Sequence, residues 1–365
     1  MVAWLWWLAS SWLTVAVGWR ILRSGVGEDG RSFLRVVRLI KQLLWLSVGM
    51  KVGGGVGIGA LGWEYSEPGW ALAIVGCLCL LLGEFGLIFW RLYPLERRFR
   101  GIELGVWRYV GMRLGFVFEV LAPVVAIAFM ALTVLYTTRG GYRDAGGRGI
   151  LWAGAMGMAG TALAVLYYRR RLVLPVRPVL LPESLMAEAQ RMAREVGVSL
   201  REVIVLDGCR AKLANAFALP GGRIAITDYL LGHLEPQEVL AVLAHEVAHL
   251  AQRRRLVRLW GYLLGIAVGL TVGLAPFWQR LPDWAGVVLM AVLGLGMSVP
   301  LVILRARHER EADTFAVSVC GVEALRTALL KSAQLNPRHA HERTDALHPS
   351  LQERLRYLRR FERNP

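Results

Sequence analysis

Long apolar stretches constrain this chain most, because a helix needs roughly 20 apolar residues to cross the hydrocarbon core of a bilayer. The sequence contains seven such stretches. With 55% hydrophobic and only 19% charged residues, they predict a mainly α-helical, polytopic membrane protein with about seven transmembrane helices. The stretches cover approximately residues 2–22, 43–62, 70–90, 115–136, 150–168, 259–277 and 284–304.

The positive charges predict an orientation. The chain has 43 Lys and Arg against 27 Asp and Glu, a net charge of +16. Basic residues gather in 23–42, in 91–113 and at 169–171, whereas loop 63–69 is acidic; loop 137–149, with three arginines, fits less well. Because Lys and Arg accumulate on the cytoplasmic side, we expect the N-terminus outside and the C-terminus inside a bacterial cytoplasmic membrane. Topology and anionic lipid explain the charge better than nucleic acid, for which no motif is present.

Two polar segments, 171–258 and 305–365, both lie on the cytoplasmic side in this topology. A five-span membrane region, 1–170, precedes them, and a two-span hairpin, 259–304, separates them. The sequence therefore predicts one cytoplasmic domain that is split by the last two spans.

The first polar segment has patterns of both helix and strand. Apolar periodicity predicts a helix over 183–196 that ends at Gly197, and the β-branched residues of 202–207 predict a strand. Residues 215–230 contain two β-leaning runs around Pro-Gly-Gly, which predicts a hairpin. Pro236 suits the first turn of the amphipathic helix that follows.

That helix carries His245, Glu246 and His249, in the pattern HExxH. Two histidines four residues apart lie on one helical face and can reach the same zinc ion, while the glutamate beside the first can act as a general base. The bare pattern is only moderately specific. The alternative is a pair of histidines on the surface of an amphipathic helix.

A catalytic zinc site needs a third protein ligand. The segment 305–316 contains Glu309 and Asp313, again four residues apart, so one carboxylate can bind metal while the other orients a ligand imidazole. Glu311 and His308 are rival ligands, but they fall on other faces of the helix. The alternative is a solvated, charge-rich helix without a metal.

Four motifs resemble a known family, the integral-membrane gluzincin peptidases that include the HtpX-type heat-shock protease and the type 1 CAAX prenyl protease. They are NAFALPGGRIAIT (215–227), LAVLAHEVAHL (240–250), HEREAD (308–313) and LHPSLQERLRYL (347–358), and the resemblance covers about 170–365. Five spans before HExxH and two after it look more like the prenyl protease, but the subfamily stays open.

The resemblance implies a cytoplasmic α+β gluzincin domain with one Zn²⁺ per chain. His245, His249 and Glu309 would bind the zinc, Glu246 would be the general base, and Asp313 would support a ligand from outside the metal. Glu246 would take a proton from the attacking water and pass it to the leaving amine.

The resemblance also implies roles for residues outside the metal group. Asn215, Ala216 and Phe217 would form an edge strand that binds extended substrate, although Asn215 could merely begin a strand. His348 would donate a hydrogen bond to the developing oxyanion, or be a surface histidine at a helix start. Arg354 is interpreted as structural, pairing with a carboxylate near the site.

These features predict a membrane-embedded zinc endopeptidase that hydrolyses membrane or membrane-associated proteins, including a role in protein quality control. A CAAX-type processing protease and a regulatory sensor peptidase are alternative enzymes. A zinc-binding membrane scaffold or receptor is the non-enzymatic alternative, against which Glu246 argues, because structural zinc sites need no base.

Three charged residues, Lys51, Glu84 and Glu119, fall well inside predicted spans, at least six residues from their cytoplasmic ends. Counted from the cytoplasmic ends, they lie at similar depths of roughly 9 to 14 Å. We therefore expect Lys51 to pair with Glu84, with Glu119 nearby, facing a bundle interior or a water-filled chamber. The alternative for Lys51 is that its flexible stem carries the charge to the membrane surface.

Overall fold

The computed structural model divides the chain into two compact units, Met1–Val173 with Val268–Leu293 and Leu174–Ala267 with Gly294–Pro365. The described residues are mainly helical. They are 2–24, 30–60, 67–115, 117, 181–219, 221–273, 304, 306–336 and 349–362.

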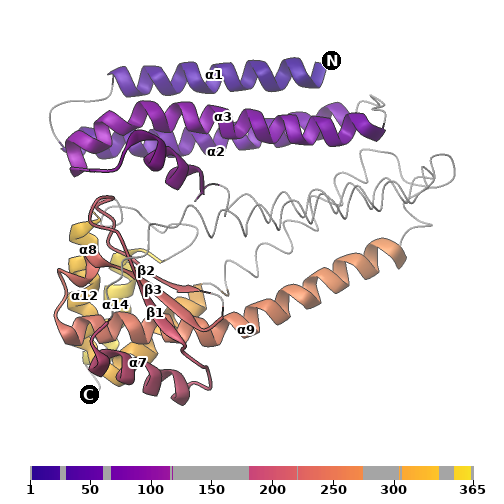
Figure 1. Ribbon diagram of the computed structural model, residues 1–365. Coiled ribbons are helices and arrows are strands. Elements are labelled where there is room, and N and C mark those ends of the chain that lie inside the picture. Colours follow the sequence, from indigo (N-terminus) through magenta and orange to yellow (C-terminus); the bar gives the residue numbers. More distant parts are fainter. Residues whose placement is uncertain are drawn as a thin grey trace. The chain divides into compact units, whose positions relative to one another are not determined.

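Three long helices dominate the described part of the first unit: α1 (Val2–Ser24), α2 (Gly30–Ala60) and α3 (Glu67–Arg100). They lie side by side, and each contacts the other two (Figure 1). Their shared interior is mostly apolar. It includes Trp7, Phe33, Val36, Ile40, Leu44, Leu81, Phe85, Ile88, Phe89 and Leu92.

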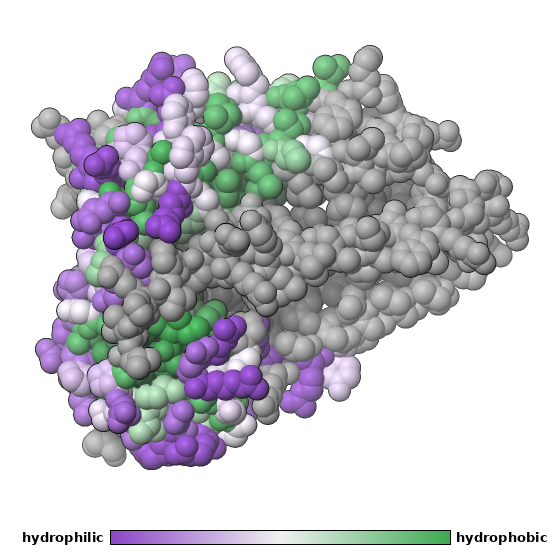
Figure 2. Space-filling model, viewed as in Figure 1, coloured by the Kyte–Doolittle hydropathy of each residue, from purple (hydrophilic) through white to green (hydrophobic). Residues whose placement is uncertain are grey.

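These helices also expose large apolar side chains. Their aliphatic residues are green on the hydropathy scale of Figure 2, and green spheres are visible on the upper part of the surface drawn there. Trp12 is 73% exposed and Trp45 is 52% exposed. Nevertheless, within the described ranges, none of the helices combines the length and the apolarity needed to cross a membrane. The predicted stretches 115–136, 150–168 and 284–304 fall almost wholly outside the described residues. The seven-span topology therefore stays a prediction.

The second unit contains a three-stranded sheet of β1 (Glu202–Leu206), β2 (Ala216–Leu219) and β3 (Arg223–Thr227). Its order is β1-β3-β2, with β1 parallel and β2 antiparallel to β3. The predicted hairpin is thus present, and Gly221 and Gly222 take the positive φ angles of its turn. Among the described residues, β2 lies at an edge of this sheet.

In the view of Figure 1, the labelled helices of the second unit lie below this sheet and to its left. The long helix α9 begins at Pro236, as predicted, and continues past the expected boundary at residue 258, because no proline interrupts it. The helices are α7 (Glu183–Glu195), α8 (Asp228–Leu231), α9 (Pro236–Gly273), a helix over 306–320, α12 (Val322–Leu335) and α14 (Leu351–Glu362).

One apolar core fixes the rotation of α9. Leu243, Val247 and Leu250 on this helix are buried, and they belong to one cluster with residues of the other elements. Because these positions recur every three to four residues, they bury one face and leave another for the polar HExxH side chains. The remaining buried members include Ala189, Met192, Ala193, Ile224, Ala316, Leu325 and Leu358.

Candidate metal centre

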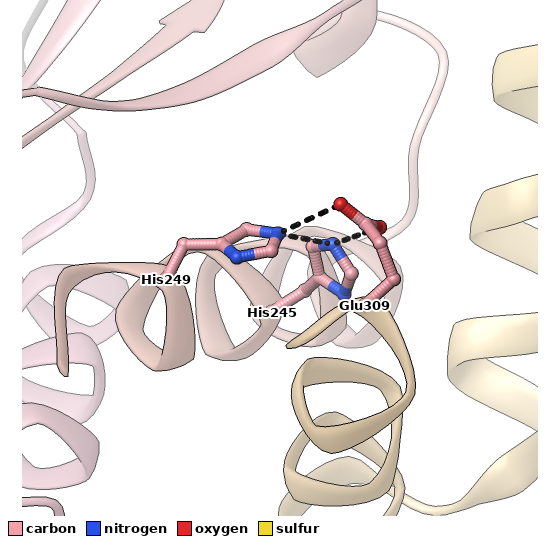
Figure 3. Close-up of side chains that lie close together, drawn as sticks. All are labelled: His245, His249 and Glu309. Atoms are coloured by element: carbon pink, nitrogen blue, oxygen red, sulfur yellow. Dashed lines mark hydrogen bonds and ion pairs between the residues drawn. The ribbon is translucent and has the colours of Figure 1, made fainter. Parts of the chain in front are cut away.

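His245 and His249 present their Nε2 atoms to each other from consecutive turns of α9 (Figure 3). The two Nε2 atoms are 3.0 Å apart, and the rings are nearly perpendicular with centroids separated by 4.6 Å. This arrangement follows from the four-residue spacing, which places both side chains on one helical face.

Glu309 completes the group from the helix over 306–320 (Figure 3). Its Oε2 lies 3.6 Å from Nε2 of His245, and its Oε1 lies 3.5 Å from Nε2 of His249. One ligand atom from each residue lies within 4.8 Å of the others. Two imidazole nitrogens and one carboxylate oxygen are the donor set of many catalytic zinc sites, so these residues fit a zinc ion.

Glu246 is the neighbour of His245 on α9, and it is buried. Its charge acts on both His249 and Arg354. A carboxylate that is shielded from bulk water and lies beside three potential metal ligands is well placed for proton transfer.

Asp313 lies one turn beyond Glu309 and supports His245 from the side away from the metal group. Its Oδ1 is 3.0 Å from Nδ1 of His245, and Arg354 on α14 makes two hydrogen bonds to the same carboxylate. Burial opposes the charged form of Asp313, but Arg354 and His245 lower its pKa to about 2. Burial likewise opposes a charged His245, but Asp313 and Glu309 raise its pKa to about 9.

Gln252 supports His249 in a different way, and sequence reasoning missed it. Its side chain bridges Nδ1 of His249 and the backbone carbonyl of His308. The only signal in the sequence is its position one helical turn after His249.

Glu311 and His308, the rivals of Glu309 as third ligand, lie in other surroundings. Glu311 accepts a hydrogen bond from Arg307, 2.9 Å between Nε and Oε1, and lies 3.9 Å from Arg255. The ring of His308 is buried, which lowers its pKa. Among the described residues, neither joins the group that could hold a metal.

Asn215, Ala216 and Phe217 lie at the beginning of edge strand β2 and are half-buried. The Asn215 side chain accepts a hydrogen bond from the Ala216 backbone N–H at 2.9 Å. None of the hydrogen bonds described for these residues reaches the histidines. His348 lies outside the described residues, so its predicted role has no structural counterpart here.

Asn336 is a second residue that no pattern in the sequence would have selected. It follows α12 and pairs with both backbone polar groups of Ala214, the residue before Asn215. This contact joins positions 122 residues apart. It fixes the chain where β2 begins.

The first unit contains the ion pair of Lys51 and Glu84 that we expected from their similar depths in the predicted membrane spans. Lys51 Nζ donates to Glu84 Oε2 at 2.8 Å and to Ser47 Oγ at 2.8 Å, while Ser47 donates to the other Glu84 oxygen. The Lys51 and Glu84 side chains are 0% and 1% exposed, so the charge of Lys51 does not reach a surface of this unit. Glu119 lies outside the described residues.

Comparison with known proteins identifies similar sequences. The sequence model of the protein family Peptidase family M48 matches residues 181–362 of this chain. A protease HtpX homolog from Acidiphilium cryptum is 32% identical over 221 residues, which are 55% of this chain and 75% of that protein. A protease HtpX homolog from Aeropyrum pernix is 33% identical over 171 residues, which are 42% of this chain and 51% of that protein.

A solved structure extends the likeness of fold to nearly the whole chain. The crystal structure of S. mikatae Ste24p matches with a TM-score of 0.52 at 17% sequence identity. The match covers 98% of this chain and 96% of that one.

Proposed function

Because this chain belongs to peptidase family M48, a family of metallopeptidases, we propose that it is a membrane-embedded, zinc-dependent endopeptidase. The observation that carries the proposal is the convergence of His245, His249 and Glu309 within 4.8 Å, beside the buried Glu246. These three residues would hold one zinc ion per chain. A structural site would have no use for the glutamate.

Bound zinc would supply Lewis acidity for the scissile carbonyl and for the attacking water. Glu246 would accept the proton of that water and transfer it to the leaving amine. Asp313 would hold the His245 ring through its Nδ1–H, so that Nε2 stays directed at the metal. Arg354 would keep Asp313 ionised in a buried position.

Two further residue roles belong to this proposal. β2 has a neighbour strand on one side only in the described sheet, which supports pairing of an extended substrate with residues 215–217. His348 would donate to the oxyanion that develops on the substrate.

Substrates in or near a bilayer are supported by two features. The described surface of α1–α3 exposes large apolar side chains, including Trp12 and Trp45, which is unusual for a surface in water. In addition, α9 carries HExxH and then the apolar residues from 259 onward on one continuous helix, so His249 lies only about 15 Å from that apolar stretch. We propose that the site lies on the cytoplasmic side of a bacterial membrane. There the enzyme would cleave membrane or membrane-associated proteins as part of protein quality control.

A test uses the purified full-length protein in detergent, with zinc content and cleavage of casein or of the protein itself measured together. Glu246→Gln should keep about one zinc per chain and lose cleavage by orders of magnitude, because it removes the base and spares the ligands. Glu311→Gln serves as the control and should keep both. Zinc binding without cleavage by the unaltered protein would instead support a scaffold. The Glu246→Gln variant can then trap substrates in cells.

A further inference from the structure

Gln252 joins the two polar segments of the catalytic unit at the candidate metal centre. Its Oε1 is 2.8 Å from Nδ1 of His249, and its Nε2 donates to the backbone carbonyl of His308 at 2.8 Å. The side chain comes from α9, whereas His308 is the residue immediately before Glu309. Gln252 is 7% exposed, so water does not compete freely for these bonds.

The backbone carbonyl determines which way the Gln252 amide is turned. A carbonyl oxygen can only accept a hydrogen bond, so the group that faces His308 must be the NH₂ of Gln252. The oxygen of the same amide must then face His249, and it too can only accept. Nδ1 of His249 is therefore the donor, which leaves the lone pair of the neutral ring on Nε2.

We propose that Gln252 is a positioning residue that holds His249 in its Nδ1–H tautomer and ties that ligand to the helix bearing Glu309. The proposal rests on the proposed function, since Nε2 of His249 is directed at the group that would bind zinc. One amide thereby sets the proton on one ligand and contacts the residue next to another, His308, which is 56 residues from Gln252 in the sequence.

The two histidines have unlike supports. His245 donates to Asp313, a carboxylate that is itself paired with Arg354, whereas His249 donates to a neutral amide. A second carboxylate behind His249 would add a buried negative charge to a group that already includes Glu246 and Glu309, and it would face the carbonyl of His308. A neutral residue that both accepts and donates satisfies both neighbours.

A role in packing alone would leave the tautomer and the metal affinity unchanged. The test therefore uses two substitutions in the full-length protein. Gln252→Met keeps the length of the side chain but removes both hydrogen bonds. Gln252→Glu keeps the acceptor for His249 and loses the donor to His308. Gln237→Met, at an exposed position of the same helix, is the matched control.

Two measurements separate the possibilities. The first is zinc affinity by chelator competition, and the second is the ¹⁵N NMR spectrum of the metal-free protein with labelled histidine, in which the His249 signals are those lost in His249→Ala. We expect Gln252→Met to weaken zinc binding 10- to 100-fold and to populate the Nε2–H tautomer of His249. Gln252→Glu should restore the Nδ1–H tautomer and part of the affinity, and Gln237→Met should change neither.

Unaltered zinc affinity together with an unaltered His249 tautomer in Gln252→Met would overturn the proposal. If that variant fails to fold, an Nε2–H tautomer in Gln252→Glu or in the unaltered metal-free protein would overturn it equally. Neither measurement uses cleavage. A protein that binds zinc through this tautomer without hydrolysing peptides would therefore contradict the proposed function and leave the role of Gln252 standing.

Discussion

The guanidinium group of Arg354 makes two hydrogen bonds to the carboxylate of Asp313, 41 residues earlier in the chain. Nε of Arg354 lies 2.9 Å from Oδ2 of Asp313, and both side chains are largely buried. Because Asp313 also contacts His245, α14 contributes to the order of the candidate metal centre without supplying a ligand. Asp313 is thus a carboxylate of the kind that we expected Arg354 to contact.

We expect Arg354→Lys to lower zinc affinity roughly tenfold, because an ammonium group cannot make the two parallel hydrogen bonds of a guanidinium. Chelator competition on the purified protein measures this. Arg356→Lys, at an exposed position of the same helix, should leave the affinity unchanged. Equal affinities for the two variants would contradict a role for Arg354 in supporting the ligands.

Glu309→Gln should abolish stoichiometric zinc binding, whereas Glu311→Gln should retain it, because only Glu309 directs its carboxylate at the two histidines. Metal content by elemental analysis after dialysis distinguishes the variants. The opposite result would move the third ligand by two residues and change the helix face that meets α9.

Lys51→Met and Glu84→Gln should each destabilise the protein, by about 3 kcal/mol or more, because each strands a buried opposite charge. The double variant should recover part of the loss. Thermal unfolding in detergent measures the stability of the unaltered protein, the two single variants and the double variant, which together form a double-mutant cycle. Arg38→Met, at an exposed position of α2, is the control. Strictly additive effects of the two substitutions would show that the pair is not coupled.

Glu238 should make the stability of the catalytic unit depend on acid pH. Burial opposes its charge, but hydrogen bonds from Lys331 and the Glu235 backbone N–H outweigh burial and lower its pKa below 4.5. A lowered carboxyl pKa contributes stability above about pH 4.5 that is lost as the pH falls through the folded-state value.

The comparison of Glu238→Gln with the unaltered protein tests this contribution. The variant should unfold more easily at pH 7, by about 1 kcal/mol given the partial exposure of Lys331, and the difference should shrink as the pH falls below 4.5. Glu362→Gln, at the exposed end of α14, should show no such pH dependence. If the stability difference between Glu238→Gln and the unaltered protein stayed constant with pH, the charge of Glu238 would not be its cause.

The predicted topology can be tested by cysteine labelling in a variant that lacks the native cysteines. A probe at Gln352→Cys, on the exposed side of α14, should react with a membrane-impermeant reagent only after cell lysis. Ser66→Cys, in the acidic loop predicted to lie outside, should react in intact cells. Labelling of position 352 in intact cells would reverse the assignment of the catalytic side.

The features of the catalytic unit that could be predicted from the sequence are those set by residues close together in the chain. The hairpin at 215–230, the helix start at Pro236 and the shared face of His245 and His249 all follow from residues within a few positions of one another. The continuation of α9 beyond residue 258 was not foreseen, because a change from polar to apolar composition marks a change of surroundings and need not end a helix.

The pair of Lys51 and Glu84 shows how far sequence reasoning reaches over a distance. Equal depth along two predicted helices was enough to propose the contact, because a buried charge needs a partner of opposite sign. Ser47 forms hydrogen bonds with both Lys51 and Glu84. It could not be selected in this way, since many serines lie at a similar position along a predicted helix.

The sequence by itself determined the chemistry available to this protein: two histidines and a glutamate at helical spacing, a later pair of carboxylates, and the apolar stretches that predict a membrane. Only the tertiary structure decided how that chemistry is oriented. The contacts of Gln252 with His308, of Asn336 with Ala214 and of Arg354 with Asp313 join residues far apart in the chain. Their partners depend on how the helices pack around the shared core, and a side chain's spacing within its own helix does not specify that packing.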